Sequence, residues 1–375
     1  MGDDWIRLCK PIFSAEVEQR LAEVLRSGYL VQGPHVAAFE QAVAERLGVR
    51  HAVAVNSGTS ALHLAFLAAG LGPSARVLMT DFTFPSPASV LEMVGAQPVF
   101  VDIAPDGYNM DLDQAERICE GRADLTAIVA IHQFGECLDM ERVMKLADRR
   151  GLTVIEDAAC AIGVTCGGRS AGAFGRMGCL SFHPRKVLST GEGGMIVTDD
   201  DATAERLRRL RNHGLARTFD EDLDVLEPGL NLRLPEMQAI LGLEQIRRVD
   251  ELLTHRQAVA RVYHERLTGV PGLTLPGAPW PGGHNFQSYV VRLPDGVFRN
   301  QVVARLREHR IESTLGTYAV HRLGYFRRKY GLSDVALPRA TRAWRQCLSL
   351  PIGDHVTGAE ADRVADALIE ALAVR

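Results

Sequence analysis

A lysine among small and apolar residues is the sequence feature that most clearly suggests chemistry. Lys186 ends the run Ser181–Lys186 (SFHPRK), which follows a short apolar stretch and precedes the glycine-rich run Gly191–Gly194. A partly desolvated lysine loses its proton more readily, and the neutral amine can attack an aldehyde to form an imine. Most lysines are solvated surface charges, so a chemical role for Lys186 depends on what else lies near it.

Small polar residues form a second candidate site. Ser57, Gly58 and Thr59 follow a short apolar run and lead directly into a helical pattern. Backbone N–H groups and hydroxyls at a helix N-terminus can hold a phosphate. An ordinary Ser/Thr helix cap is the alternative and, for this motif alone, the more common one.

Two further residues follow other apolar runs. Phe84 could stack on a flat cofactor, although core packing is the commoner role of such a ring. Asp157 could hold a pyridine nitrogen protonated, which makes the ring a good electron sink. A helix cap or an ion pair would explain Asp157 equally well. The conjunction of phosphate site, ring, acid and lysine nevertheless favours one shared cofactor.

The elements that must position these residues follow an α/β pattern. Short apolar runs alternate with helix-period segments from about residue 50 to 200, which predicts a mostly parallel sheet with crossover helices. Open parallel sheets bind ligands at the carboxyl ends of their strands, where the candidate residues fall. The expected strands are His51–Val55, Val77–Met79, Pro98–Val101, Ala127–Ile131, Thr153–Ile155, Cys179–Phe182 and Met195–Thr198. The expected helices between them are Ser60–Ala69, Ser86–Val94, Leu112–Cys119 and Met140–Arg149.

The rest of the chain predicts a second, smaller domain. Helical periodicity is expected over Ala15–Leu25 and Val36–Leu47, outside the sheet, and over Pro235–Leu267. A Pro- and Gly-rich stretch, Val270–Gly283, follows and marks a change of domain. We expect a cofactor-binding large domain over residues 1–250 and a small α+β domain over residues 251–375.

These motifs resemble the DegT/StrS family of aminotransferases, which act mainly on nucleotide-linked ketosugars and have the aspartate aminotransferase fold. The resemblance covers the chain to about residue 265 and is weak beyond it. The Ser181–Lys186 block with its Gly-Glu-Gly-Gly tail is the most specific match. The other matching blocks are Ser27–Tyr29, Gly33–Pro34, Asn56–His63, Glu156–Ala159, Arg211–Gly214 and Asn231–Ala239.

The resemblance implies a pyridoxal 5'-phosphate (PLP) enzyme, with the pyridoxamine 5'-phosphate form as its intermediate. Lys186 would carry the cofactor as a Schiff base and later move the proton. Asp157 would pair with the pyridine nitrogen and Phe84 would stack on the ring. The phosphate would be held by Ser57, Gly58, Thr59 and Ser181. An asparagine matching Asn231 reaches the neighbouring subunit's cofactor in this family, which implies a homodimer with shared active sites.

Other site residues are less firmly placed by the resemblance. Cys160 stands where the family most often has Gln or His beside the ring oxygen, and a thiol is a weak hydrogen-bond donor. His183, Tyr318 and His321 are candidate contacts to the sugar, although a histidine with a purely structural role is the commoner case.

The expected reaction transfers an amino group from an amino acid, with L-glutamate as the expected donor, to a keto group of a nucleotide-linked sugar. A cyclitol ketone is an alternative acceptor. A sugar dehydratase of the family would have His in place of Lys186, and a non-catalytic regulatory protein would have lost the lysine, acid or phosphate motif. The sequence has neither a G-x-x-x-x-G-K-[ST] nor an H-E-x-x-H motif, which argues against a P-loop nucleotide enzyme and a metal hydrolase.

The composition is that of a globular protein. The formal net charge is -4 and the charges are mixed along the chain, so neither nucleic acid nor membrane is an expected partner. The seven scattered cysteines predict reduced thiols, without a disulfide framework or a metal site. No leader or long apolar span is recognisable, and a cytoplasmic location is expected.

Overall fold

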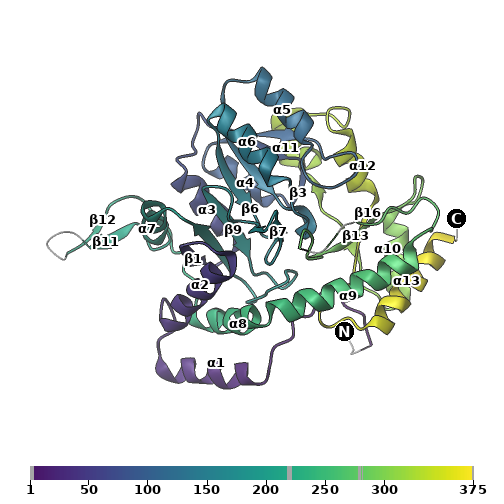
Figure 1. Cartoon of the computed structure of the whole chain (residues 1–375), viewed down its shortest axis with the longest axis horizontal. Helices are drawn as coiled ribbons and strands as arrows, with labels where there is room; N and C mark the ends of the chain where they lie inside the picture. The colour runs from purple at the N-terminus through teal and green to yellow at the C-terminus, as the bar shows by residue number, and fades with distance from the viewer. Residues whose placement is uncertain (1–3, 218–221, 278–279, 281, 374–375) are drawn as a thin grey trace.

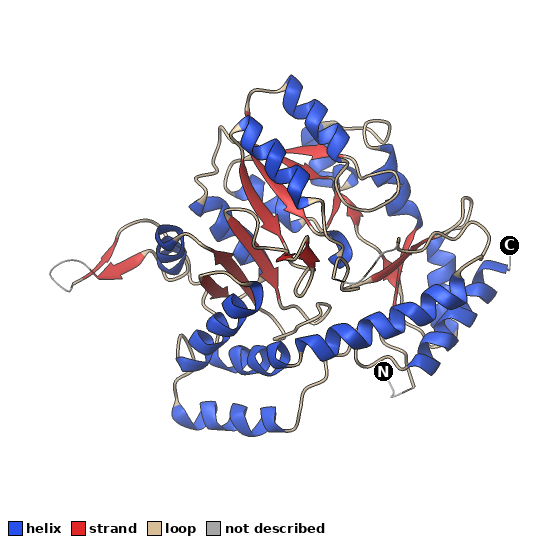
Figure 2. Ribbon diagram, in the orientation of Figure 1, coloured by secondary structure: helices blue, strands red, loops and turns tan. Residues whose placement is uncertain are grey.

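A seven-stranded sheet forms the centre of the larger part of the molecule (Figures 1 and 2). The computed structural model describes residues 4–217, 222–277, 280 and 282–373. The strand order is β1-β10-β9-β6-β5-β2-β4, and only β10 runs antiparallel to its neighbours. The strands are β1 (His51–Val55), β2 (Arg76–Thr80), β4 (Gln97–Val101), β5 (Leu125–Ile131), β6 (Thr153–Asp157), β9 (Met177–Ser181) and β10 (Gly194–Thr198).

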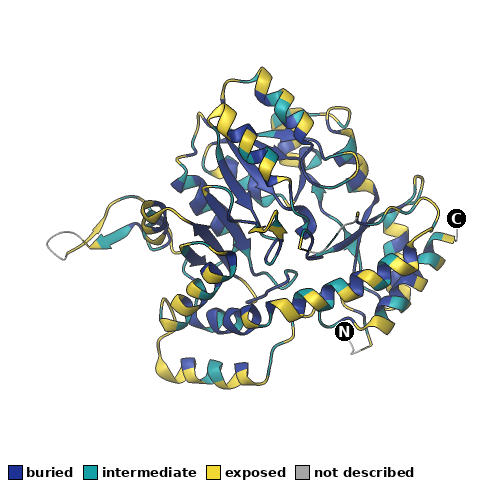
Figure 3. Cartoon of the chain, in the orientation of Figure 1, coloured by how far each residue is buried: buried dark blue, intermediate teal, exposed yellow. Residues whose placement is uncertain are grey.

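Helices cover both faces of this sheet because alternate strand residues point to opposite sides. On β1, for example, Val53 and Val55 join the core beneath α3, α4 and α7, whereas Ala52 and Ala54 join the core beneath α2 and α8. The strands are accordingly buried while the outer helix faces are exposed (Figure 3). The helices are α1 (Glu16–Ser27), α2 (Pro34–Leu47), α3 (Gly58–Ala68), α4 (Ser86–Met93), α5 (Leu112–Gly121), α6 (Met140–Arg150), α7 (Asp201–Leu210) and α8 (Glu236–Arg247).

A three-stranded sheet with its own core forms the smaller part. Its order is β13-β16-β14, and the helices that cover it include the long α9, which leads away from α8 (Figure 1). Ile6 also belongs to this core and pairs with Ile311, so the start of the chain is tied to the small sheet. The elements are α9 (Val249–Leu267), β13 (Tyr289–Arg292), α10 (Arg299–Glu308), β14 (Thr314–Leu315), β16 (Cys347–Leu350) and α13 (Gly358–Ala373).

A late segment returns from the small sheet to the large one. Strand β15 (Tyr318–Ala319) pairs with β3 (Phe82–Thr83), and α11 (Gly324–Tyr330) and α12 (Pro338–Gln346) contribute to the core of the large sheet. The short helix η2 (Val320–Arg322) joins β15 to α11. The expected domain division at residue 250 stays a prediction, and the packing crosses it in both directions.

The predicted strands and helices of the large sheet are confirmed, with ends shifted by a few residues. Several elements were not predicted from the sequence, among them α7. The others include η1 (Gln133–Gly135), the hairpins β7 (Thr165–Cys166) with β8 (Arg169–Ser170) and β11 (Leu215–Arg217) with β12 (Leu223–Val225), and the α11, α12 and β16 segments given above. Among the described residues, every helix is too short or too polar to cross a bilayer.

The expectation that all cysteines are reduced is wrong for one pair. Cys137 and Cys166 form a disulfide, with their Cα atoms 6.1 Å apart. The two residues are 29 positions apart, and the fold brings them together because β5 and β6 end side by side at one edge of the sheet. Sequence spacing carries no information about that convergence.

Candidate active site

The turn between β1 and α3 forms the predicted phosphate site. Ser57 caps α3, and its hydroxyl accepts a hydrogen bond from the backbone N–H of Ser60 at 3.1 Å. Gly58 lies against the end of β9, where a Cβ atom would come within 2.7 Å of the Ser181 Cβ. The absence of a side chain at Gly58 therefore lets Ser181 and the helix N-terminus face the same small space. The hydroxyls of Thr59 and Ser86 are hydrogen-bonded to each other, with their oxygens 2.8 Å apart.

Lys186 lies on the turn that follows Ser181. Its backbone N–H donates to the His183 carbonyl at 2.8 Å, and the His183 Nδ1 accepts from the Arg185 N–H at 3.2 Å. Burial lowers the pKa of His183, which suits a neutral ring that braces the turn. The Lys186 side chain is half-buried, and its Nζ donates to the Cys160 sulfur at 3.2 Å.

Asp157 ends β6, the strand next to β9, and lies opposite Cys179, two residues before Ser181. The carboxylate is 7% exposed and accepts one hydrogen bond, from the Ala159 N–H at 3.1 Å. Burial raises its pKa, while the Ala159 N–H and the charges of Lys186 and His132 act in the opposite direction. Among the described residues no cation forms an ion pair with Asp157. Because an unpaired buried carboxylate is unfavourable, this site fits a cationic ring nitrogen.

Glu156 is a buried neighbour of Asp157 to which no sequence motif assigned a role. It is fully buried and accepts hydrogen bonds from three backbone N–H groups and from His132, whose Nε2 lies 3.0 Å away. The three donors are Gly172 at 2.8 Å, Phe174 at 2.6 Å and Gly175 at 2.7 Å. These bonds fix the end of β6 and hence Asp157. The glycine-rich run over residues 167–178 was the available signal, since its backbone wraps this carboxylate.

The structure brings Phe84 and Tyr318 together. Their ring centroids are 6.2 Å apart in an edge-to-face arrangement, because β3 and β15 pair Thr83 with Tyr318. The Phe84 side chain is 61% exposed, which leaves its ring free to contact a ligand.

His321 has a different environment. It is buried, and its Nδ1 lies 2.7 Å from the Asp81 carboxylate while its Nε2 faces the Thr341 hydroxyl at 3.3 Å. Both ring nitrogens therefore have protein partners. The structure does not add His321 to the group around Lys186, and its role as a substrate contact stays a prediction.

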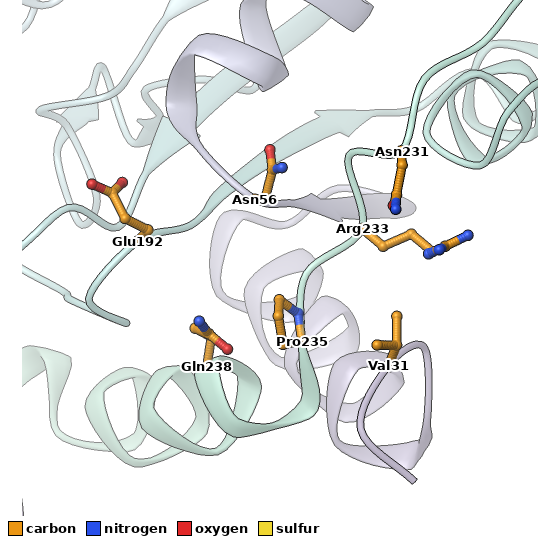
Figure 4. A pocket seen from close by; sticks show the side chains of 7 residues that line it. All are labelled: Val31, Asn56, Glu192, Asn231, Arg233, Pro235 and Gln238. Carbon is orange, nitrogen blue, oxygen red and sulfur yellow. The ribbon is translucent and has the colours of Figure 1, made fainter.

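Asn231 lines a cavity of about 310 Å³ (Figure 4). Asn56, at the end of β1, and Glu192, from the glycine-rich run after Lys186, also line it. The Asn231 side chain is exposed and comes from a loop that crosses beside β1. Its predicted contact with a neighbouring subunit's cofactor stays a prediction.

Comparison with known proteins decides the family. Residues 11–369 match the sequence profile described as the DegT/DnrJ/EryC1/StrS aminotransferase family. The chain belongs to this family. It therefore depends on PLP, and its residues fit that cofactor at the end of β6 and at the Gly58–Ser181 contact.

Relatives match along nearly the whole chain. The chain is similar to the spore coat polysaccharide biosynthesis protein SpsC of Bacillus subtilis (strain 168), at 34% identity over 96% of this chain and 95% of the relative. It is 36% identical to the GDP-perosamine synthase of Caulobacter vibrioides, over 91% of each chain. Its fold is similar to the crystal structure of S. venezuelae DesV in complex with a ketimine intermediate, with a TM-score of 0.89 and 35% identity over 96% of this chain and 95% of that one. The chain is thus a transaminase with the fold type I architecture.

Proposed function

We propose that this aminotransferase moves an amino group from an amino acid, with L-glutamate as the donor, to a keto group of a nucleotide-linked sugar. The observation that carries the proposal is the half-buried Lys186 amine at the same sheet edge as the unpaired Asp157 carboxylate. The name of the Caulobacter relative, a GDP-perosamine synthase, supports a nucleotide-linked sugar as the acceptor.

Each residue of the site has a distinct task in this proposal. PLP, when bound, supplies the electron sink that lets a proton leave the carbon beside nitrogen. Asp157 would accept a hydrogen bond from the protonated ring nitrogen, and the N–H groups of Ser57–Thr59 with the Ser181 hydroxyl would hold the phosphate. Lys186 would hold the cofactor through its amine and, once that amine is free, would take up and return the proton at its Nζ, because the side chain already lies beside the reacting carbon. Phe84 covers the ring.

A second copy of the chain completes the site in this proposal. Tyr29, Leu30 and Val31, before α2, and Leu230, beside Asn231, are large exposed apolar residues. Val31 also lines the cavity that contains Asn231. Exposed apolar patches next to a polar cavity mark protein interfaces. A homodimer would cover them and place Asn231 of each chain at the phosphate of the other. The proposed location of the enzyme is the cytoplasm.

Related functions predict different site chemistry. A cyclitol aminotransferase would use the same residues with a different acceptor and is the second candidate. A PLP-dependent dehydratase would have His in place of Lys186, and a regulatory member would have lost the lysine, the acid or the phosphate motif, whereas Lys186, Asp157 and Ser57–Thr59 are all present.

The absorption spectrum of the PLP-reconstituted protein tests the proposal. Wild type should show a visible cofactor band that bleaches when glutamate is added and returns when a nucleotide-linked ketosugar follows. Lys186→Ala should lose the band and the turnover. Lys145→Ala, at an exposed lysine paired with Glu141, is the matched control and should behave as wild type. Return of the band with a cyclitol ketone alone would favour the second candidate, and turnover by Lys186→Ala at the wild-type rate would refute the assignment of Lys186.

A further inference from the structure

A short segment that leads into the small sheet is held by the large domain on both sides. The Cys137 N–H donates to the Gly283 carbonyl at 2.8 Å, and the Thr165 N–H donates to the Gly282 carbonyl at 2.6 Å. The Asn285 N–H in turn donates to the Gly135 carbonyl at 3.0 Å. Residues 135–137 and 160–166 thus form two jaws around residues 282–287, and we call this arrangement the clasp.

The inner end of the clasp touches the residues around Lys186. The Asn285 side-chain amide donates to the carbonyl of Cys160 at 2.8 Å and to that of Ile162 at 2.9 Å. The Gln287 amide donates to the Arg185 carbonyl at 2.8 Å. The chain on either side of the Lys186–Cys160 contact is therefore fixed by the small-domain segment.

The Cys137–Cys166 disulfide joins the two jaws directly. Cys137 belongs to the jaw after η1, and Cys166 lies in the β7–β8 hairpin that ends the other jaw. Both residues are half-buried rather than fully enclosed. The closed loop runs from residue 137 to residue 166 and includes Asp157 and Cys160, so the bond ties both ends of the segment that supplies the acid.

A second set of contacts connects Cys137 with Asp157. The Leu138 N–H, next to Cys137, donates to His132 Nδ1 at 3.2 Å, and His132 Nε2 faces Glu156 at 3.0 Å. The His132 N–H also donates to the Asp157 carbonyl at 3.2 Å. Movement of the jaw at Cys137 would therefore be transmitted to the end of β6.

We propose that Cys137 and Cys166 form a reversible thiol–disulfide site that closes the clasp when oxidised and loosens it when reduced. The reductant is a small thiol of the glutathione class. A thiolate attacks one sulfur and displaces the other cysteine as a thiolate, and a second thiol then releases the first; two thiols become one disulfide while the protein gains two thiols. Disulfides in cytoplasmic proteins are commonly of this transient kind. The effect on the cofactor rests on the function proposed above, whereas the thiol chemistry does not.

A metal site is the competing explanation for the same residues. His132, Cys137 and Cys166 each offer one possible metal-ligand atom, and these three atoms lie within 4.8 Å of one another. Among the described residues, this is the group of three or more such ligands that could hold a metal ion. Both ring nitrogens of His132 already have partners, Leu138 N–H and Glu156. A metal would have to break one of these buried bonds, which favours the disulfide.

Peptide mapping of the full-length, PLP-loaded protein tests the thiol chemistry. The protein is equilibrated in glutathione buffers from oxidising to reducing, free thiols are blocked with a maleimide, and the digest is analysed by mass spectrometry. Cys137 and Cys166 should be linked in oxidising buffer and become blocked together in reducing buffer, while half-buried Cys9 stays free throughout. Free Cys137 and Cys166 in fully oxidised protein, a link that survives excess reduced glutathione, or one zinc per reduced chain by elemental analysis would overturn the proposal.

Hydrogen exchange tests the clasp separately from activity. The amides of Thr165 and Asn285, which donate across the clasp, should exchange at least tenfold faster in the reduced protein than in the oxidised one. Cys137→Ser and Cys166→Ser should each show the fast rate in either buffer, and Cys9→Ser should follow wild type. Equal exchange in both buffers would mean that the bond does not control the clasp, even if the enzyme proves to be an aminotransferase. Faster release of PLP on reduction would connect the clasp to the active site.

Discussion

The amine of Lys186 donates a hydrogen bond to the thiol of Cys160 at 3.2 Å, and both side chains are half-buried. The resemblance implies a larger Gln or His at this position, and in its place a thiol leaves more space beside the lysine. We expect alkylation of Cys160 to fill that space and to reduce turnover by about 100-fold, since displacement of a reacting group by an ångström has effects of this size.

Rates of inactivation by iodoacetamide, with and without bound PLP, measure this effect. Cys160→Ser should keep activity and resist the reagent, whereas Cys9→Ser should be inactivated like wild type. Inactivation of Cys160→Ser at the wild-type rate would place the sensitive thiol elsewhere.

We expect the buried charge of Asp157 to lower the stability of the cofactor-free protein while supporting catalysis. Asp157→Asn removes the buried charge, and we expect turnover to fall by about 100-fold or more because the ring nitrogen loses its anionic partner. The cofactor-free variant should be more stable than wild type by about 1 kcal/mol at neutral pH. Burial raises the pKa of Asp157, so the folded state holds this proton more tightly than the unfolded state and wild type loses stability as pH rises through that range. Urea unfolding at several pH values checks the sign; a variant less stable than wild type at pH 7 would contradict it.

Gly58 should be intolerant of a methyl group. In Gly58→Ala the new Cβ would come within 2.7 Å of the Ser181 Cβ, which forces apart the two sides of the proposed phosphate site. We expect a loss of about 1–3 kcal/mol in unfolding free energy and weaker PLP binding by fluorescence titration. Gly72→Ala, where nothing lies within 4 Å of the added atom, is the control. Wild-type PLP affinity in Gly58→Ala would exclude this contact from the cofactor site.

Glu236 should be important for stability although it is far from Lys186 in sequence. Its carboxylate is 1% exposed and accepts hydrogen bonds from the N–H groups of Gly33, His35 and Val36, at the start of α2. Glu236→Gln should cost about 2–4 kcal/mol, because a neutral amide can satisfy fewer of these donors and one of its own hydrogens faces them. Chemical denaturation measures the change, with exposed Glu265→Gln as the control. A change below 0.5 kcal/mol, the size of an ordinary surface substitution, would disprove the role.

His321 should affect stability in a pH-dependent way. Burial alone would lower its pKa, but the Asp81 and Asp334 carboxylates outweigh burial and raise it. The stabilising contribution is therefore present at pH 6 and lost as pH rises through the raised pKa. His321→Asn should destabilise the protein by about 1–3 kcal/mol at pH 6 and by less at pH 9, with little effect on the KM for the acceptor. A large rise in KM at unchanged stability would instead support a substrate contact.

The sequence was sufficient for the large sheet because its signals are local. Alternating apolar runs and helix-period segments identified its strands, and the rule that ligands bind at the carboxyl ends of strands placed Lys186, Asp157 and Ser57–Thr59 at one edge. The structure brings these residues to that edge, through the neighbouring ends of β6 and β9 and the Gly58–Ser181 contact.

Long-range pairings could not be predicted in the same way. The Cys137–Cys166 bond, the Glu236 cap of α2 and the pairing of β3 with β15 join residues whose spacing follows no period. For Glu156 the glycine-rich run over residues 167–178 was an indirect signal, but the sequence does not show that its N–H groups reach this carboxylate. These contacts form only in the completed fold, and a single sequence shows the two residues of each contact without showing that they meet.

The return of β15, α11 and α12 to the large sheet has a consequence for biosynthesis. Ala319, Phe326 and Cys347 belong to the same core as Val53 of β1. This core therefore cannot be completed until these late residues have left the ribosome. The core that contains Ile6 also includes Leu368, so it cannot be completed until that later residue has been synthesised. The nascent protein must therefore keep an unpaired strand edge and apolar surface from associating with other molecules for most of its synthesis, a period in which chaperones matter most.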